Sequence, residues 1–455
     1  MEKQPAEVQL KQGALGFWDC FMIAVGGMVG MAIFTLSGVT FSLAGPASLL
    51  AWVVGGLIVC LYALNVAEMA TKFPRAGGLY VYPSESLGNN ETVRQLGGWL
   101  AAWSWVNVTV LGAAFGAIFI ANYVSAFLPG ADQYVVPLGL LSVGLVWLLN
   151  VLGITLMGRA NLILTACLMA ICLVFSLQAL PNMRPDAFTP FFAGFLGMQG
   201  FVSAIPIAML AYGSVIAVAS VAEEVRDPRR TIPRAMGWSL ITTIALYALV
   251  LVSTYGIINW QAVTEGSFGF YAPLHFAIVH FAPGAGWLMN LVSVAALFAI
   301  TTTMLVMIMD SGRTLMAMGR TGLLPRAFAK VHPKTQTPVF ALTFVSAMAA
   351  VIACFPYLTM KIISTGSFTF GVLVIIIVLS VIGSRIYRTD VKAVFTAPGG
   401  IVLQVLTLAV LAFTLTRLGR DAFVLSGWWY LIGMAYFVLR YALKPAEKSK
   451  KPAGM

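Results

Sequence analysis

The stretch that decides the fold is WDCFMIAVGGMVGMAIFTLS, residues 18–37, an apolar run with glycines at positions 26, 27 and 30. Its length is that of a membrane-spanning helix, which needs about 20 apolar residues. Each glycine weakens a helix by about 1 kcal/mol relative to alanine, so we expect a break within the run. A break would free backbone N–H groups near mid-membrane, and these groups attract a carboxylate together with the dipole of the following half-helix. The alternative is close helix packing through small residues, because Gly26 and Gly30 have GxxxG spacing.

The composition shows that this run is one of many. Of the 455 residues, 60% are hydrophobic and 9% are charged, whereas soluble domains are about 45–50% apolar and about 25% charged. This excludes a soluble enzyme, a disordered protein and a nucleic-acid binder, so we expect the lipid bilayer as a partner and no nucleic acid. The long, continuous runs also exclude an outer-membrane barrel. Backbone groups in lipid must be satisfied within their own segment, so the runs are expected to be helices.

Twelve apolar segments predict an all-α membrane protein with 12 transmembrane helices. They lie at about 18–37, 46–70, 97–127, 135–156, 161–180, 199–222, 235–258, 286–316, 338–356, 362–384, 400–417 and 427–443. Two connections are long, at about 71–96 and at about 259–285, after the second and the seventh segment. The first five and the next five segments therefore overlay as a 5+5 inverted repeat, about 18–180 and 199–384, which is a transporter architecture.

The same segments divide the chain into regions. Residues 18–384 form the predicted transport core, and residues 400–443 form two additional C-terminal transmembrane helices. Residues 1–17 lack the pattern of a signal peptide, so we expect a cytoplasmic N-terminal tail. Residues 444–455 form a basic cytoplasmic tail that anchors the topology.

The net charge of +11 is a signal of sidedness. With the N-terminus inside, 23 of the 27 lysines and arginines fall in the tails and in the connections on that side, and four fall on the other side. Those four are Arg184, Lys361, Arg417 and Arg420. Because Lys and Arg favour the cytoplasmic side, we expect a multi-pass protein of the cytoplasmic membrane with both termini in the cytoplasm.

A second interrupted segment occupies the corresponding position of the second half, at Ala211-Tyr212-Gly213-Ser214-Val215. Paired glycine-interrupted segments in two halves are the best sequence pointer to a transport site. Carbonyl groups freed at the second break would accept hydrogen bonds from an ammonium group. The alternative is a simple kink at Pro206. The candidate substrate-binding residues are therefore Gly26, Gly27, Met28, Val29, Gly30, Ala211, Tyr212, Gly213, Ser214 and Val215.

Four motifs occur in order over roughly residues 16–340. They are Gly30-Met31-Ala32-Ile33-Phe34, then NVAEMATKFPRAGGLY at 65–80, AEEVRDPRRTIPR at 222–234 and SGRTLMAMGRTGLLP at 311–325. The first resembles the G-x-G-I-F element of the amino acid–polyamine–organocation (APC) transporter superfamily, and the second resembles its E-L-A-x-x-x-P-x-A-G-G-x-Y signature. The last two motifs are similar to further elements of that superfamily. The resemblance implies a secondary active transporter that has the leucine-transporter (LeuT) fold and works by alternating access.

The chain departs from the superfamily pattern at three places. Ala32 replaces the second glycine of the first element and would narrow the carboxylate site. Val215 and Ile216 stand where the family often has an aromatic gate followed by a polar or acidic residue. Residues 161–180 contain no lysine, whereas some proton-coupled members carry one there, so lysine-based coupling is not expected.

The resemblance also points to polar residues on other segments. In sodium-coupled members, hydroxyls of the eighth helix join carbonyls of the first around a sodium ion, which makes Thr302 and Thr303 candidate ligands of a coupling ion. The alternative is that these hydroxyls bond the preceding helical turn. Asn107 lies on the third segment, which borders the substrate in this fold. Symport with H⁺ or Na⁺ and exchange of substrates all fit the resemblance.

Charged residues gather near the helix ends on the predicted inner side. Glu68 stands four residues before Lys72, and Asp310 stands three before Arg313, so ion pairing at an inner gate is expected, with proton carriage as the alternative. Glu223 and Glu224 have the same interpretation because arginines 226, 229 and 230 follow them. The candidate gate residues are Glu68, Arg75, Glu223, Glu224, Asp310 and Arg313.

The remaining residues bear on substrate and chemistry. No acidic residue lies in the predicted centre of the first, third, sixth or tenth segment, so we predict a small, net-neutral amino acid as substrate. The alternative is an amine, polyamine or cationic amino-acid transporter or antiporter of the same fold. The five cysteines lie in apolar segments without CxxC spacing, so we expect no metal site. No HExxH or GxSxG motif occurs, which favours a transporter over a membrane enzyme, a channel or a sensor, and we expect no cofactor.

Overall fold

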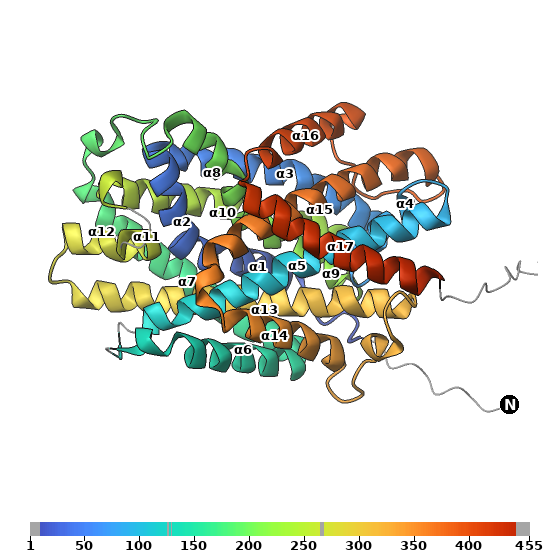
Figure 1. The fold of residues 1–455 in the computed structure, drawn as a ribbon. Helices are drawn as coiled ribbons and strands as arrows, with labels where there is room; N and C mark the ends of the chain where they lie inside the picture. Colours follow the sequence, from blue (N-terminus) through green and yellow to red (C-terminus); the bar gives the residue numbers. More distant parts are fainter. Residues whose placement is uncertain (1–9, 125–126, 129, 264–267, 443–455) are drawn as a thin grey trace, which may run out of the picture.

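The structure is a computed structural model that describes residues 10–124, 127–128, 130–263 and 268–442. Within these residues the chain forms α-helices and short 3₁₀ helices and no β-strand, and its isolated bridge joins Leu15 to Val225 (Figure 1). The prediction of an all-helical protein is confirmed.

The helices follow the apolar segments of the sequence. Their bounds are α1 (Phe17–Val29), α2 (Met31–Ala44), α3 (Ser48–Lys72), α4 (Gly78–Ser86), α5 (Glu91–Val124), α6 (Val135–Val151), α7 (Ile154–Ala179), α8 (Gly197–Tyr212), η5 (Gly213–Ile216), α9 (Ala217–Ser220), η6 (Ala222–Glu224), α10 (Pro228–Tyr255), α11 (Phe268–Tyr271), α12 (Pro273–Phe281), α13 (Gly286–Arg320), α14 (Val339–Ala353), α15 (Thr359–Tyr387), α16 (Gly400–Leu415) and α17 (Arg420–Ala442). Each of the predicted apolar segments overlaps one or more of these helices. The two long connections contain the short helices α4, α11 and α12, which a search for long apolar runs does not detect.

Eight segments among the described residues are long and apolar enough to cross a membrane. One of them, Phe17–Lys72, holds α1, α2 and α3 over 56 residues. Three shorter apolar helices, α6, α14 and α16, are also present. Length and composition therefore indicate a membrane protein with several spans.

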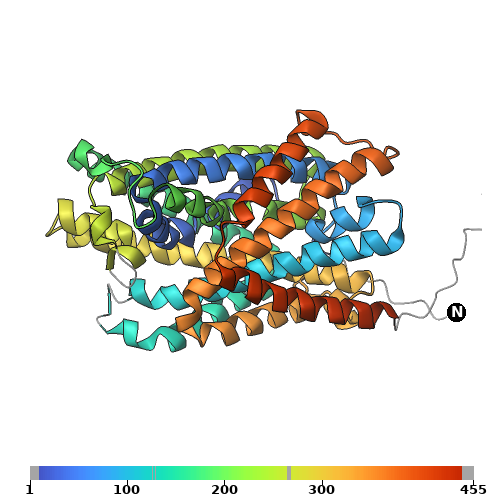
Figure 2. The same cartoon turned by 45° about the horizontal axis from the view of Figure 1, so that its top comes forward.

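The packing pairs helices that are far apart in the sequence. The long helices α5 and α13 pack together along their lengths, as do α3 and α10, and α6 packs on α14. In addition, α7 contacts α1, α10 and α13, while α15 contacts α8, α3 and α5. Helices α16 and α17 lie on the outside of the bundle against α15 (Figures 1 and 2), and their outer side chains, such as Leu431 and Ile432, are about 60% exposed, as expected for a surface that faces lipid.

The two ends of the bundle differ in chemistry. One end, where α1 begins and α3, α13 and α15 finish, holds the ion pairs of Glu68, Glu85, Glu223 and Glu224 with arginines. We call it the basic end. Helices α11 and α12 lie at the opposite end, on the left in Figure 1. The interrupted helices α1–α2 and α8–α9 meet between these two ends.

Candidate functional site

The break in the first helix falls at Gly30. Helix α1 finishes at Val29 and α2 begins at Met31, and Gly30 between them has φ −42° and ψ −138°. A Cβ atom on Gly30 would lie 1.4 Å from Thr303 Oγ1 and 2.8 Å from the carbonyl oxygen of Ala299. Only glycine allows α13 to approach this closely, so the break and the contact with α13 require the same residue.

The other two glycines of the motif serve packing. A Cβ on Gly26 would lie 2.3 Å from Thr165 Oγ1 of α7, and a Cβ on Gly27 would lie 2.7 Å from the Cβ of Ser214. Both interpretations of the glycine motif therefore apply, each to different residues. The contact of Gly27 with Ser214 also places the two interrupted helices side by side.

Hydroxyl groups from α10 and α13 hold the backbone around the first break. Thr302 Oγ1 donates to the carbonyl oxygens of Gly26 and Ala299, at 3.0 Å each. Thr303 Oγ1 donates to the carbonyl of Gly27 at 3.4 Å and accepts from the amide of Met31 at 3.2 Å. The side chain of Thr302 thus bonds both the first helix and its own preceding turn.

Tyr247 joins the two interrupted helices. Its hydroxyl donates to the carbonyl of Met28 and, at 3.3 Å, to the carbonyl of Ala211. No sequence motif marks Tyr247, which lies in the middle of the apolar helix α10. The sequence clue to Tyr247 was a polar side chain within an apolar helix. Many side chains that serve only packing have the same property.

The second interruption is a tightened turn. Helix α8 finishes at Tyr212, residues Gly213–Ile216 form the 3₁₀ helix η5, and α9 continues the chain. The hydroxyl of Tyr212 donates to the carbonyl of Trp52 at 3.1 Å. A Cβ on Gly213 would lie 3.2 Å from the ring of Phe370. This segment therefore differs from the first break, where one residue leaves the helical conformation. A 3₁₀ segment inside a helix often marks a hinge.

A cavity of about 60 Å³ begins at the first break and extends away from the basic end. Gly27, Met28, Ala211 and Thr303, four of the predicted site residues, line it. The remaining lining residues are Met31, Ala32, Leu36, Val108, Leu111, Gly112, Phe115, Leu210, Met307, Ile362, Ile363 and Gly366. None of these described lining residues is charged.

The other predicted site residues lie behind the lining. Residues Gly26, Val29, Gly30 and 212–215 are buried in the contacts between helices. Asn107 is also absent from the cavity lining, and its Oδ1 accepts a hydrogen bond from Thr369 Oγ1 at 2.9 Å. Asn107 therefore ties α5 to α15 beside the cavity.

At the basic end, Arg313 and Glu224 form a buried ion pair. Arg313 Nε donates to Glu224 Oε2 at 2.6 Å, and Nη2 donates to Oε1 at 3.0 Å. Their side chains are 2% and 0% exposed. The sequence suggested Asp310 as the partner of Arg313, and the structure corrects this. The two-pronged geometry that a guanidinium prefers is met by a carboxylate that arrives from η6.

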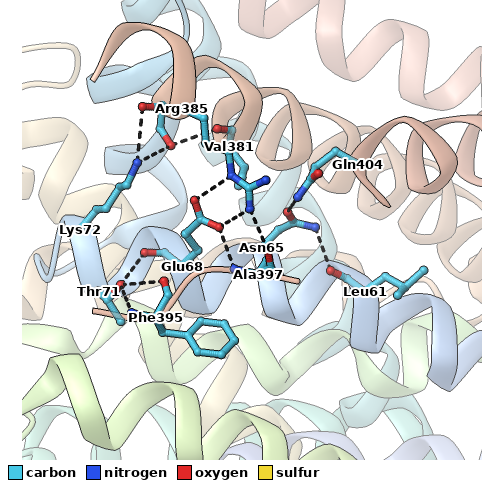
Figure 3. Close-up of polar contacts among 11 residues, drawn as sticks. Leu61, Asn65, Glu68, Thr71, Lys72, Val381, Arg385, Phe395, Ala397 and Gln404 are labelled. Atoms are coloured by element: carbon cyan, nitrogen blue, oxygen red, sulfur yellow. Dashed lines mark hydrogen bonds and ion pairs between the residues drawn. The ribbon is translucent and has the colours of Figure 1, made fainter. Parts of the chain in front are cut away.

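Glu68 also has a partner that its sequence neighbours do not reveal. We expected Lys72, one helical turn away, but Arg385 Nη2 of α15 lies 2.6 Å from Glu68 Oε2 (Figure 3). The amide of Ala397 donates to the same oxygen at 2.9 Å. Lys72 Nζ instead donates to Ser384 Oγ at 3.1 Å. These contacts fasten the connection after α15 to the end of α3.

The remaining gate candidates make more exposed pairs. Glu223 pairs with Arg320 at 3.1 Å and accepts from the amide of Ala76 at the same distance. The arginines that follow Glu223 and Glu224 in sequence are not their partners in the structure. Arg75 pairs with Glu85 at 2.8 Å and is 62% exposed. The pairs with Glu68, Glu223 and Glu224 connect helices from different parts of the chain at the basic end.

Interrupted helices beside a buried apolar cavity, inside a bundle of apolar helices, define a membrane transporter. Residues 15–439 match the family described as Amino acid permease. The chain belongs to this family, which is part of the APC superfamily, and the resemblance seen in the sequence is confirmed. It is therefore a multi-pass membrane transporter of the amino acid permease family and not an enzyme.

Individual relatives cover most of the chain at low identity. The branched-chain amino acid permease BcaP of Bacillus subtilis is 27% identical over 446 residues, 93% of this chain and 92% of that protein. BcaP of Lactococcus lactis is 28% identical, with 92% of each chain covered. Cationic amino acid transporter 7, chloroplastic, of Arabidopsis thaliana is 28% identical over 84% of this chain and 67% of that protein.

Proposed function

We propose that the protein is a secondary active transporter that carries a small, net-neutral amino acid with a branched apolar side chain. The observation that carries the proposal is the cavity beside the first break, whose described lining is uncharged and rich in Met, Leu and Ile. An apolar pocket with few polar groups at one end fits a zwitterion with an apolar side chain. A cationic side chain would leave its charge unpaired in this cavity, which is unfavourable at membrane depth.

The two interruptions give the proposed substrate its orientation. The carboxylate binds at the start of α2, where the first-turn N–H groups lack helical partners and the dipole favours negative charge. The amine binds at carbonyl groups near the end of α8, where Ala211 lines the cavity. Ala32 also lines the cavity, so its methyl group limits the space for the carboxylate. Both names of the BcaP relatives agree with this substrate class.

We propose the same topology that the sequence predicts. The Phe17–Lys72 segment is long enough for two crossings, and with the other long helices and the three shorter ones this supports twelve spans. The contacts support an inverted repeat of the LeuT type, residues 18–180 and 199–384. Contacts of α7 with α1, α10 and α13 correspond to those of α15 with α8, α3 and α5. The basic end is then cytoplasmic, with both termini, and the protein resides in the cytoplasmic membrane.

Besides substrate exchange, symport with either of two coupling ions, sodium or a proton, is compatible with this site. Thr302 and Thr303 are candidate ligands of a sodium ion, together with the carbonyl oxygens of Gly26 and Gly27. Sodium would have to replace the hydrogen bonds that these hydroxyls donate to the same carbonyls. A proton is the other candidate coupling ion.

Counterflow in proteoliposomes tests the proposed substrate, because it requires no coupling ion. We expect liposomes loaded with unlabelled leucine to take up labelled leucine, isoleucine and valine. Lysine and putrescine should neither be taken up nor compete. The runner-up is transport of cationic amino acids or polyamines, which the name of the Arabidopsis relative favours. Counterflow of lysine or putrescine without any response to leucine would establish the runner-up and reject our proposal.

A further inference from the structure

Three carboxyl groups are buried among the described residues, and one of them has no basic partner. Glu68 pairs with Arg385 and Glu224 pairs with Arg313. Asp310 is 0% exposed, and the nearby Arg313 is already engaged by both oxygens of Glu224. The group formed by Glu224, Arg313 and Asp310 therefore carries one uncompensated negative charge when Asp310 is ionised.

The surroundings of Asp310 contain further unsatisfied polar groups. Its Oδ2 accepts from the indole Nε1 of Trp105 at 2.8 Å, while its Oδ1 has no hydrogen-bond partner. The hydroxyls of Tyr62 and Tyr82 are also buried without partners, and both tyrosines lie within electrostatic reach of Asp310. Ser220 of α9 lies close enough for its hydroxyl to interact with the carboxyl group, and this hydroxyl also donates to the carbonyl of Ala217. Helices α3, α4, α5, α9 and α13 thus converge on one carboxyl group.

The neighbouring groups cannot neutralise Asp310. Burial, and then the charge of Asp310, raise the pKa of Tyr82 well above its ordinary value, so its phenol stays neutral. The facing residues Tyr62, Ser220 and Trp105 carry no charge. The arginine on its own helix belongs to Glu224. An isolated buried carboxylate is unfavourable by several kcal/mol, and such a group takes up a proton where it can.

Asp310 also lies on the side of the cavity that faces the basic end. Met307 lines the cavity on α13 and Asp310 is three residues further toward the basic end, on the same helix face. On α5, Val108 lines the cavity and Trp105 lies three residues further in the same direction. The ring of Phe370 lies 6.4 Å from that of Trp105 and 6.0 Å from that of Tyr62. These rings therefore pack together beside Asp310, near the end of the cavity that faces the basic end.

We propose that Asp310 is the binding site of a coupling proton, a role that rests on the proposed transport function. A proton from the water on the far side protonates Oδ1 and removes the buried charge, which stabilises the state in which the basic end is closed. The acid then donates its O–H to a phenol oxygen of Tyr62 or Tyr82. When α3, α4 and α9 move away from α5 and α13, water enters, the carboxyl group ionises and the proton leaves on the cytoplasmic side. No other bond changes.

Transport in sodium-free proteoliposomes tests this assignment. An inward proton gradient should drive accumulation of labelled leucine by the wild type. Asp310→Asn should lose about tenfold or more of this accumulation, since coupling between two ligands is typically 5- to 150-fold. Its counterflow at equal pH on both sides should no longer vary with that pH, because position 310 then has no group to protonate. Asp186→Asn, which removes an exposed carboxyl group at the far end, is the control and should accumulate leucine like the wild type.

Two results would overturn the proposal. One is an Asp310→Asn variant that accumulates leucine under a proton gradient as the wild type does. The other is wild-type accumulation that requires a sodium gradient and ignores the proton gradient. Both experiments use an amino acid for which wild-type counterflow is positive, so failure of the proposed function is seen separately in that counterflow.

Infrared difference spectroscopy provides a test that needs no transport. The difference between wild-type spectra at acidic and alkaline pH should contain the C=O band of a buried carboxyl group that is protonated at the acidic pH. Trp105→Phe should shift this band, because the indole no longer donates to the carboxyl group. If Asp310→Asn does not fold, this second variant decides. A wild-type spectrum without the band, or a band that Trp105→Phe leaves unchanged, would contradict the assignment.

Discussion

Gly30 determines the geometry of the first break at the scale of a single residue. We predict that Gly30→Ala abolishes leucine counterflow and lowers the melting temperature, because the added Cβ would overlap Thr303 Oγ1 at 1.4 Å. Overpacking of this kind destabilises by about 1–3 kcal/mol. Gly237→Ala in α10, where a Cβ would meet nothing within 4 Å, should leave both properties unchanged. Normal counterflow by Gly30→Ala would show that the contact with Thr303 is dispensable.

The two neighbouring glutamates of η6 form ion pairs that differ in burial, so we predict different effects when each is replaced by glutamine. Glu224→Gln removes the negative charge that pairs with the buried Arg313, and breaking a buried ion pair lowers stability by about 3–5 kcal/mol. Glu223→Gln affects a pair that is 28–35% exposed, which is worth about 0–1 kcal/mol. Thermal unfolding of the two purified variants in detergent measures the difference. Equal melting temperatures would mean that the pair of Arg313 with Glu224 has no special role in closing the basic end.

At the scale of the element, helix α12 adds a pH-dependent term to stability. Burial lowers the pKa of His275 to about 4 from its ordinary 6.5. As the pH falls from 6.5 toward 4, the unfolded chain binds a proton that the folded chain does not, so stability decreases. The free energy of unfolding of His275→Gln should therefore fall less between pH 7 and pH 5 than that of the wild type, by on the order of 1 kcal/mol. His280→Gln, an exposed position on the same helix, should retain the wild-type slope, and identical slopes in all three proteins would refute the prediction.

The elements also show what a sequence can predict. Long apolar helices were predictable because length and hydropathy alone specify them, and the triple glycine indicated the break. Which glycine breaks the helix depends on Thr303, more than 270 residues away, and no local pattern contains that contact. The partners of Glu68 and Glu224 were missed for the same reason, since neighbours along a helix were considered and the actual arginines arrive from α15 and α13. Helix α4 was missed because it is short and contains Pro83.

At the scale of the whole molecule, ion pairs connect the helices at the basic end, and the cavity extends toward the opposite end. In the alternating-access mechanism that we propose, opening of the basic end requires the pair of Glu68 with Arg385 to separate, along with the hydrogen bond to Ala397 (Figure 3). A single cysteine at Gly366, a cavity-lining position where a Cβ meets nothing within 4 Å, reports accessibility once the five native cysteines are replaced by serine or alanine. In this background, a membrane-impermeant thiol reagent should modify the position from the far side and should be slow from the basic end.

Weakening that pair should change the balance of accessibility. Arg385→Lys keeps the positive charge but removes the planar guanidinium that binds both oxygens of Glu68. A loss of about 1 kcal/mol shifts the equilibrium toward the state that is open at the basic end by roughly fivefold. We expect modification of the cysteine at position 366 from the basic end to increase by this factor in inside-out vesicles, while the rate from the far side decreases. Arg75→Lys is the matched control, because the Arg75 side chain in its pair with Glu85 is largely exposed. This substitution should leave both modification rates unchanged. Equal rates in Arg385→Lys and the parent protein would show that this pair does not restrain opening.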